Sequence, residues 1–258
     1  MTQDIRIDSD AGILELTLNR PDRKNALTNE MYGVLADQIE AAGKDGTTRV
    51  ILLQGEGDLF CAGNDLGEFA LQAEGKGPKE RQVFRFLRAL AGATPPVIAA
   101  VQGKAVGVGT TMLLHCDLVV LAEDAQLVTP FVNLALVPEA ASTLLMPLRI
   151  GHVRAYEMFA LGEPVGATQA LTWGLANRVV PRAQLGQTAR ELAARLATKP
   201  LGSLSATKRL MRQTDAIVAH MDRESEIFRE RLKGPEAREA FRAFAEKRAP
   251  DFSRIRDA

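Results

Sequence analysis

The chain has few of the residues that build disulfide frameworks, metal centres and charged binding surfaces. It contains two cysteines, Cys61 and Cys116, and three histidines among 258 residues. The cysteines form no C-x-x-C pair, so neither a disulfide framework nor a zinc site is indicated, and a reducing compartment suits the composition. Lysine plus arginine and aspartate plus glutamate both number 32. No excess of one charge therefore points to nucleic acid or to an anionic membrane.

Long hydrophobic runs are also missing. No apolar stretch approaches the length of a membrane span, and Met1 is followed by the polar stretch TQDIRIDSD rather than by a basic and then apolar leader. We therefore expect a soluble, cytoplasmic protein that binds neither nucleic acid nor membrane. With 46% hydrophobic residues, the chain is long enough to bury a sizeable core. Chemistry on a small molecule is the default expectation.

The hydrophobic pattern predicts an α/β fold. DIRID and GILELTL are alternating runs joined by SDAG, which is typical of a hairpin. Three nearly continuous apolar runs, at residues 50–54, 97–101 and 118–122, predict strands buried on both faces. Helical patterns lie between them, beginning after Thr28 as N-cap, and this alternation favours parallel pairing. The last part of the chain reads as helices at residues 184–198, 200–213, 215–232 and 235–247.

Two glycine-bearing loops follow predicted strands. LFCAGNDL covers residues 59–66, and VQGKAVGVGTTMLL runs from residue 101 through three glycines into a predicted helix. Free backbone N–H groups at such a helix start favour an anion or a developing oxyanion. The alternative is that the glycines only permit turns and close packing. Neither loop matches a phosphate-binding glycine motif, so nucleotide binding is disfavoured.

Four segments, in the correct order, resemble the enoyl-CoA hydratase/isomerase family, also called the crotonase superfamily. They are LNRPDRKNALT (18–28), FCAGNDL (60–66), VQGKAVGVGTTMLLHCDLVV (101–120) and GLANRVVP (174–181). The resemblance implies an α/β spiral of repeated strand-strand-helix units, which we assign to residues 1–195. It also implies a C-terminal helical region, residues 196–258, that assembles a homotrimer or a hexamer made of two trimers.

The resemblance further implies acyl-CoA thioester substrates and a place in fatty acid metabolism. Coenzyme A is then part of the substrate, so no separate cofactor and no metal are expected. The shared device of the family is a pair of backbone N–H groups that holds the thioester oxygen as it becomes an enolate, and these donors fall on Ala62 and Val108. The residues expected to bind substrate are Lys24, Ala26, Leu27, Gly63, Asp65, Leu66, Gly107, Gly109, Thr111 and Phe131.

The chain departs from the family's hydratases at two positions. By the resemblance, the hydratases of the family hold a water molecule between two glutamates. This sequence has Thr111 and Phe131 at the corresponding positions. Hydration needs one group to activate water and another to manage the proton on the α-carbon. Threonine and phenylalanine cannot take these roles, so we do not expect this chain to have the activity of these hydratases.

One carboxylate remains, in ALVPEAAS at residues 135–142. A glutamate after proline is common in the first turn of a helix, where Glu139 could simply answer the helix dipole. However, TPFVNLALVPEAAS (129–142) resembles the Δ3,Δ2-enoyl-CoA isomerase branch, in which the glutamate of a P-E pair is the lone catalytic residue. Apolar neighbours would desolvate the carboxylate and make it a stronger base. We therefore expect Glu139 to face the acyl pocket rather than to cap its own helix.

Other interpretations stay open. A different acyl-CoA lyase or hydrolase, an unusual hydratase, or a non-catalytic acyl-CoA-binding protein could use the same fold, since one scaffold hosts many chemistries. His115 lies among apolar residues and is expected to be hydrogen-bonded structure rather than a base. No role is assigned to Cys61 or Cys116, because nothing in the sequence indicates a lowered thiol pKa.

Overall fold

The computed structural model describes residues 3–65, 67, 68, 71, 76–78, 80–253 and 255. The strands in this part are β1 (Ile5–Asp10), β2 (Ile13–Leu18), β3 (Val50–Gly55), β4 (Val97–Val101), β5 (Lys104–Val106), β6 (Leu118–Ala122), β7 (Gln126–Val128), β8 (Val165–Gly166) and β9 (Arg178–Val180). The α-helices are α1 (Asn29–Ala42), α3 (Gln82–Ala91), α4 (Val108–Thr111), α5 (Ser142–Ile150), α6 (His152–Leu161), α7 (Ala167–Trp173), α8 (Leu185–Ala197), α9 (Leu201–Met211), α10 (Thr214–Lys233) and α11 (Pro235–Ala245). Short 3-10 helices are η1 (Pro21–Arg23), η2 (Met112–His115), η3 (Val132–Leu134) and η4 (Arg182–Gln184).

The larger sheet has the strand order β1-β2-β3-β4-β6-β9. β1 and β2 pair antiparallel as a hairpin, and every later neighbour pairs parallel. Parallel neighbours need long crossover connections, and α1 and α3 lie in the first two of these. A smaller sheet has the order β5-β7-β8. The predicted α/β class, the hairpin and the three parallel strands are thus confirmed.

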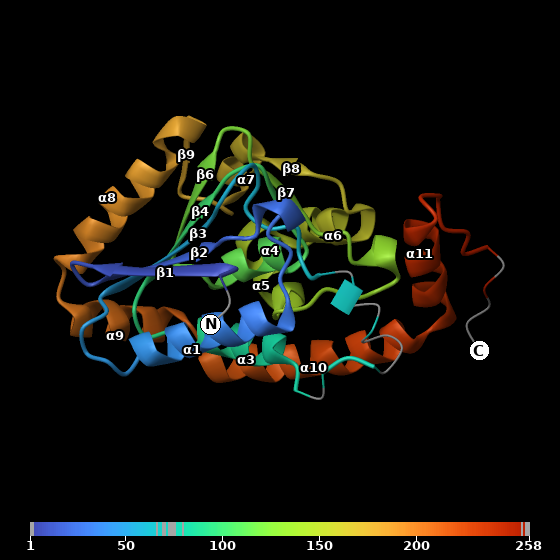
Figure 1. Ribbon diagram of the computed structural model, residues 1–258, viewed down its shortest axis with the longest axis horizontal. Helices are drawn as coiled ribbons and strands as arrows, with labels where there is room; N and C mark the ends of the chain where they lie inside the picture. The colour runs from blue at the N-terminus through green and yellow to red at the C-terminus, as the bar shows by residue number, and fades with distance from the viewer. Residues whose placement is uncertain are drawn as a thin grey trace.

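Both faces of the larger sheet are buried, each by different helices. Ile51 and Leu53 of β3 belong to the main core together with α1 and α3, whereas Val50 and Leu52 belong to a second core under α8. Figure 1 shows α8 on one side of the sheet and α1 with α3 on the other. Successive side chains of a strand point to opposite faces of the sheet, and helices cover both faces. The sequence of such a strand is therefore a continuous run of apolar residues.

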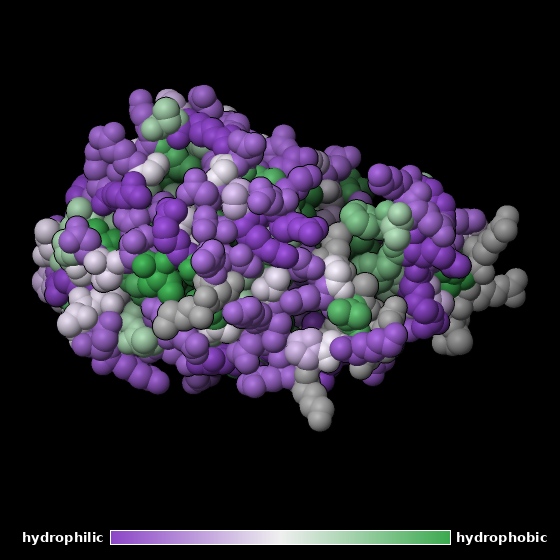
Figure 2. All heavy atoms as spheres, in the orientation of Figure 1, coloured by the Kyte–Doolittle hydropathy of each residue, from purple (hydrophilic) through white to green (hydrophobic). Residues whose placement is uncertain are grey.

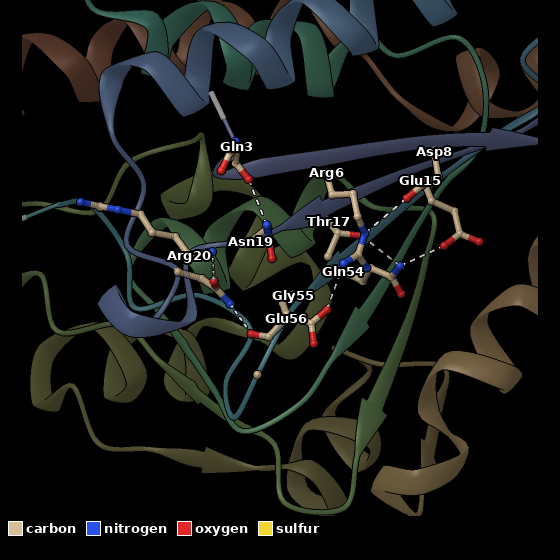
Figure 3. A network of polar contacts seen from close by, with 12 residues as sticks. Gln3, Arg6, Asp8, Glu15, Thr17, Asn19, Arg20, Gln54, Gly55 and Glu56 are labelled. Atoms are coloured by element: carbon tan, nitrogen blue, oxygen red, sulfur yellow. Dashed lines mark hydrogen bonds and ion pairs between the residues drawn. The ribbon is translucent and has the colours of Figure 1, made fainter. Parts of the chain in front are cut away.

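Near the hairpin edge, the α8 face of the sheet becomes polar (Figure 3). The Gln54 side-chain amide donates to Glu15 at 3.0 Å and to the Thr17 hydroxyl at 3.2 Å. Glu15 also accepts from Arg190 of α8 at 2.8 Å, and this guanidinium lowers the pKa of Glu15. The network joins β2, β3 and α8 where α8 no longer covers the strands.

The first helix has the predicted boundaries. The Thr28 hydroxyl accepts the Met31 N–H at 3.2 Å, which satisfies one of the free donors of the first turn, and Gly43 follows the last helical residue. The four predicted C-terminal helices correspond to α8, α9, α10 and α11. Arg88 of α3 forms an ion pair with Asp222 of α10, so α10 runs back along the body of the molecule (Figure 1). The domain boundary at residue 195 stays a prediction.

Most of the large apolar side chains lie in the core, and the surface is correspondingly polar. Figure 2 shows a face of the molecule that is mostly hydrophilic, with small hydrophobic areas between polar side chains. No helix in the described part of the chain is both long enough and apolar enough to cross a membrane.

Candidate active site

Three distant segments meet beyond the end of β3. The loop after β3 forms a bridge from Cys61 to Ala105 of β5. It then passes residue 27, where the Leu27 N–H donates to the Gly63 carbonyl at 2.8 Å and the Asp65 N–H donates to the Leu27 carbonyl at 2.9 Å. These backbone bonds bring the predicted pocket walls around Leu27, Gly63 and Asp65 together with the second glycine loop.

The second glycine loop leaves the first N–H of α4 without a hydrogen-bond partner in the described part of the chain. Gly107, the N-cap, has φ 56° and ψ −119°, a conformation that side chains disfavour. Val108 is the first helical residue, so its N–H has no partner inside the helix. A Cβ on Gly109 would lie 2.9 Å from both Cβ and the carbonyl oxygen of Cys61. Glycine therefore lets α4 begin directly against the first loop, and the Val108 N–H stays a predicted oxyanion donor.

The first loop does not offer the predicted donor. The Ala62 N–H donates to the Lys24 carbonyl at 3.0 Å, so this group is already occupied and the prediction for Ala62 is wrong. Gly63, with φ 94°, then turns the chain. The backbone N–H of Asn64 has no hydrogen-bond partner among the described residues, and Asn64 lines the same cavity as Val108. Asn64 is thus the better candidate for the second donor.

An apolar cavity lies at these N–H groups. It is lined by Ala62, Gly63, Asn64, Val106, Gly107, Val108, Pro130, Phe131, Leu134, Leu136 and Phe228. Phe131 is buried and packs edge-on against Phe159, with ring centroids 6.4 Å apart. Phe228 comes from α10, so the C-terminal helices complete the wall. Apolar walls with a few fixed polar groups are typical of small-molecule sites.

Glu139 lies in the loop that leads into α5. Its Oε1 is buried and has no hydrogen-bond partner among the described residues. Burial, and to a lesser degree the negative charge of Glu224, raise the pKa of Glu139 to about 7, against the opposing charge of Arg81. A carboxyl with this pKa and a buried, unpaired oxygen has the properties of a general base at neutral pH.

Glu139 does not cap α5. The N–H groups of Ala141 and Thr143 donate instead to the carboxylate of Glu224, at 2.6 and 2.9 Å. The capping interpretation of Glu139 is therefore excluded by the contacts of this helix start. Glu224 of α10 accepts the hydrogen bonds of the helix start, which leaves the Glu139 carboxylate available for chemistry.

A second, more polar cavity adjoins the first at Asn64. It is lined by Leu27, Asn29, Tyr32, Asn64, Asp65, Glu68, Pro78, Arg81 and Val83. The Tyr32 hydroxyl donates to the Asn64 side-chain oxygen at 2.6 Å. Burial raises the pKa of Tyr32, and the charge of Glu139 adds to this shift, so the Glu139 carboxylate lies near the Tyr32 hydroxyl. Tyr32 thereby fixes the residue whose N–H is the candidate donor.

Most of the other predicted pocket residues lie around these cavities. Arg20 holds the Asp65 carboxylate at 2.7 Å and the Ala26 carbonyl at 3.0 Å, which joins the two predicted wall segments. Leu27 is buried against the second cavity, whereas Lys24 is exposed at a left-handed position, φ 55°. Leu66 lies outside the described residues. A coenzyme A contact for any of these residues stays a prediction.

Two further positions matter for the chemistry. Thr111 is fully buried and its hydroxyl has no partner in the described part of the chain. His115, one turn later, is buried, and its Nε2 lies 2.8 Å from the Ala140 carbonyl. Burial lowers the pKa of His115 to about 3, so the ring is neutral and structural, as predicted. Burial also raises the pKa of both Cys61 and Cys116 to about 12, which excludes thiolate chemistry at neutral pH.

Sequence reasoning missed four residues of this site: Tyr32, Asn64, Arg81 and Glu224. Tyr32 lies on α1 and Glu224 on α10, and the periodicity of these helices gives no sign of their contacts. The one available signal was Glu224 itself, because an unpaired glutamate on the apolar face of a helix needs a partner. Arg81 lies in the basic segment RQVFRFLR at residues 81–88, whose pattern is typical of a solvated helix face and also allows a contact with coenzyme phosphates.

The chain is similar to known proteins over nearly its whole length. The family model described as "Enoyl-CoA hydratase/isomerase" matches residues 8–255. The "1,2-epoxyphenylacetyl-CoA isomerase" of Escherichia coli (strain K12) is 36% identical, covering 94% of this chain and 95% of that protein. The "2,3-dehydroadipyl-CoA hydratase" of the same organism is 34% identical, covering 93% and 94%. A crystal structure of an enoyl-CoA hydratase/isomerase from Pseudoalteromonas atlantica T6c has a TM-score of 0.92 and 40% identity, covering 97% of this chain and 100% of that one.

Proposed function

Because the chain belongs to the enoyl-CoA hydratase/isomerase superfamily and has its spiral α/β fold, we propose that this acyl-CoA enzyme is a Δ3,Δ2-enoyl-CoA isomerase. The observation that carries the proposal is the Glu139 carboxyl group, whose Oε1 is buried and unpaired and whose pKa is about 7. The corresponding hydratase positions hold Thr111 and Phe131, neither of which transfers protons to or from water.

Glu139 takes a proton from C2 of a 3-enoyl thioester. The electron pair of the broken C2–H bond moves toward the carbonyl, and the thioester oxygen becomes the negative end of a dienolate. Glu139 then returns its proton to C4, where an electron pair of the dienolate forms the new C4–H bond and leaves the double bond between C2 and C3. A single base suffices because C2 and C4 lie on one face of an extended conjugated system.

The dienolate oxygen needs donors. We assign this role to the backbone N–H groups of Val108 and Asn64, which supersedes the earlier assignment to Ala62. Removing one donor of an oxyanion hole typically raises the barrier by about 3 to 4 kcal/mol. The Tyr32 hydroxyl supports Asn64 through its 2.6 Å hydrogen bond.

The test is ultraviolet monitoring of purified protein with a 3-enoyl-CoA, which follows the appearance of the conjugated 2-enoyl thioester. We expect conjugation, and we expect Glu139→Gln to lower its rate by about a hundredfold to ten-thousandfold while substrate binding persists. Glu163→Gln, at an exposed position, is the matched control and should leave the rate unchanged. Isomerisation that survives in Glu139→Gln would contradict the mechanism.

Hydration is assayed in parallel on a 2-enoyl-CoA, since several relatives are named as hydratases. Hydration without conjugation would mean that a residue other than Thr111 or Phe131 activates water, and the isomerase assignment would be abandoned. Assembly as a trimer or hexamer is a separate proposal, checked by the molecular mass in solution.

A second candidate substrate is an aromatic-derived acyl group. It is favoured by the relative named as an epoxyphenylacetyl-CoA isomerase and by the aromatic rings of Phe131 and Phe228 in the cavity wall. Chromatography of 1,2-epoxyphenylacetyl-CoA incubated with the protein distinguishes the two candidates. Loss of this compound, with no turnover of straight-chain 3-enoyl-CoA, would select the aromatic substrate.

A further inference from the structure

The turn after Glu139 has a conformation that its residues disfavour. Ala140 and Ala141 both have positive φ, 65° and 52°. The left-handed conformation is unfavourable for a residue with a Cβ, and neither residue is glycine. Such a conformation persists only when surrounding contacts impose it. Contacts with other segments of the chain must therefore impose the conformation of the turn that follows Glu139.

One side of the turn is held by His115. This histidine is fully buried, and the low pKa keeps its ring neutral. Its Nε2 lies 2.8 Å from the Ala140 carbonyl, so Nε2–H is the donor in this bond. The contact fixes the residue directly after Glu139 to the end of η2.

The other side is held by Glu224 of α10. The carboxylate accepts the Ala141 N–H at 2.6 Å, the Thr143 N–H at 2.9 Å and the Thr143 hydroxyl at 2.6 Å. Glu224 is 5% exposed, and it lies 83 residues after Ala141 in the chain. Burial raises the pKa of Glu224 to about 7, and the three donated hydrogen bonds oppose this shift because they favour the ionised form. In that form the carboxylate holds the turn through three charge-assisted bonds.

Contacts of His220 orient the Thr143 hydroxyl toward Glu224. The Arg223 guanidinium donates to His220 Nδ1 at 2.8 Å, so His220 carries its proton on Nε2. That Nε2 lies 2.7 Å from the Thr143 hydroxyl, which therefore accepts from His220 and turns its own hydrogen to Glu224. The hydrogen bonds are thus donated in one direction, from Arg223 to His220, from His220 to Thr143 and from Thr143 to Glu224.

We propose that Glu224 is a positioning residue for the base: it holds the strained turn at residues 140 and 141 so that the Glu139 carboxylate stays unpaired. The proposal rests on the proposed role of Glu139 as a base. The charged and titratable groups that act on Glu139 are Tyr32 of α1, Arg81 before α3 and Glu224 of α10. Glu224 is the one among these that also bonds the turn.

The test is Glu224→Gln, which keeps the shape of the side chain. A glutamine has one acceptor oxygen and an NH₂ group that cannot accept, so at least one backbone N–H of the turn loses its partner. We expect kcat to fall by about tenfold or more, since a small misplacement of a catalytic group is costly, while KM changes by less than about threefold. The acid limb of the pH–rate profile should move to lower pH, because a like charge beside Glu139 has been removed.

A readout without substrate separates this proposal from the proposed function. The carboxyl carbon of Glu139 is titrated by ¹³C NMR, and its signal is identified by its loss in Glu139→Gln. In Glu224→Gln the apparent pKa of Glu139 should fall, and the amides of Ala141 and Thr143 should exchange faster with solvent. This result stands even if 3-enoyl-CoA proves not to be the substrate.

The matched control is Glu239→Gln. Glu239 of α11 is also nearly buried, at 7% exposure, and accepts hydrogen bonds from Arg242 and Arg248. We expect that change to leave kcat and the Glu139 titration unaltered. Thr143→Val, which removes only the hydroxyl donor, serves if Glu224→Gln does not fold, and should shift the same readouts less. A folded Glu224→Gln with unchanged kcat and unchanged Glu139 titration would overturn the proposal.

Discussion

The face of the sheet under α8 and the turn around Glu139 are packed in opposite ways. The second core, under α8, consists of the aliphatic residues Val50, Leu52, Ile98, Ala100, Val120, Ala122, Leu185, Ala189, Leu192 and Ala193. Around the turn, four buried polar atoms have no hydrogen-bond partner in the described part of the chain: Thr111 Oγ1, His115 Nδ1, Glu139 Oε1 and Ser142 Oγ. The two left-handed alanines lie among them.

The difference shows where the molecule gains and where it loses stability. A buried polar group without a partner costs about 1 to 3 kcal/mol, and aliphatic burial offsets such a cost elsewhere in the fold. Functional sites commonly retain such unfavourable features because activity requires them. The turn is therefore expected to respond to substitution in the opposite sense to the α8 layer.

The largest effect on stability is expected in the α8 layer. Leu52 is fully buried, and Leu52→Ala leaves a cavity between β3 and α8. The free energy of unfolding should fall by about 2 to 5 kcal/mol, with kcat and KM unchanged at a temperature where the variant is folded. Urea denaturation beside steady-state kinetics checks both parts. A loss of kcat in folded protein would show that this layer is coupled to the site.

A smaller effect is expected where the two glycine loops touch. Gly109→Ala places a Cβ 2.9 Å from Cys61, which forces the start of α4 away from the first loop. We expect a loss of about 1 to 3 kcal/mol in stability and a kcat lowered by about tenfold or more, because the Val108 N–H moves. Gly202→Ala on α9, where a new Cβ meets no atom within 4 Å, is the control and should keep kcat unchanged. Equal kcat values for the two variants would argue against Val108 as a donor.

Glu139→Gln should stabilise the protein at high pH. The pKa of Glu139 is about 7 in the folded chain and near its ordinary value of 4.5 when unfolded. The folded state therefore binds more protons between these two values, and stability falls as pH rises through that window. Glutamine removes this loss, so the variant should exceed the parent by about 1 to 3 kcal/mol at about pH 8 and match it at about pH 4. Denaturation curves of both proteins at the two pH values check this prediction. An equal difference in the free energy of unfolding at both pH values would contradict it. The opposite trend from neutral His115 is common to both proteins and cancels.

The smallest effect is expected from the unpaired hydroxyl of Thr111. Valine has the same shape without the hydroxyl, so Thr111→Val should raise the free energy of unfolding by about 1 kcal/mol or less. Thermal unfolding compared with that of Thr110→Val is informative, because the Thr110 hydroxyl donates to the Ala105 carbonyl at 2.6 Å and its loss should destabilise. If both variants lose stability equally, the Thr111 hydroxyl has a partner after all.

The parts of the fold that were predictable are those set by local patterns. The hairpin, the buried strands such as Val97–Val101, and α1 with its Thr28 cap all follow from periodicity and capping residues within a few positions. Glu139 was found through its segment's resemblance to a known family, together with its apolar neighbours. Ala62 was assigned wrongly because the direction of a backbone N–H depends on the turn at Gly63, where φ is 94°.

Glu224 was not predictable because its role depends on a tertiary contact. Nothing within α10 shows that this side chain reaches the first residues of α5, 81 residues earlier at Thr143. The same holds for Tyr32, whose hydroxyl bonds Asn64 across 32 residues. Pairings over such separations depend on how the sheet and its crossover helices are assembled, which local pattern does not encode.

The bond between α10 and the start of α5 also has a consequence for the order of folding. Contacts between segments far apart in the chain form late, because closing the intervening loop must precede any gain. The strands and their helices can associate while the turn at residues 140 and 141 still samples other conformations. Ala141 and Thr143 acquire their partner only when α10 docks. During synthesis, the turn that follows Glu139 therefore reaches its final conformation only after α10, and thus almost the whole chain, has been made.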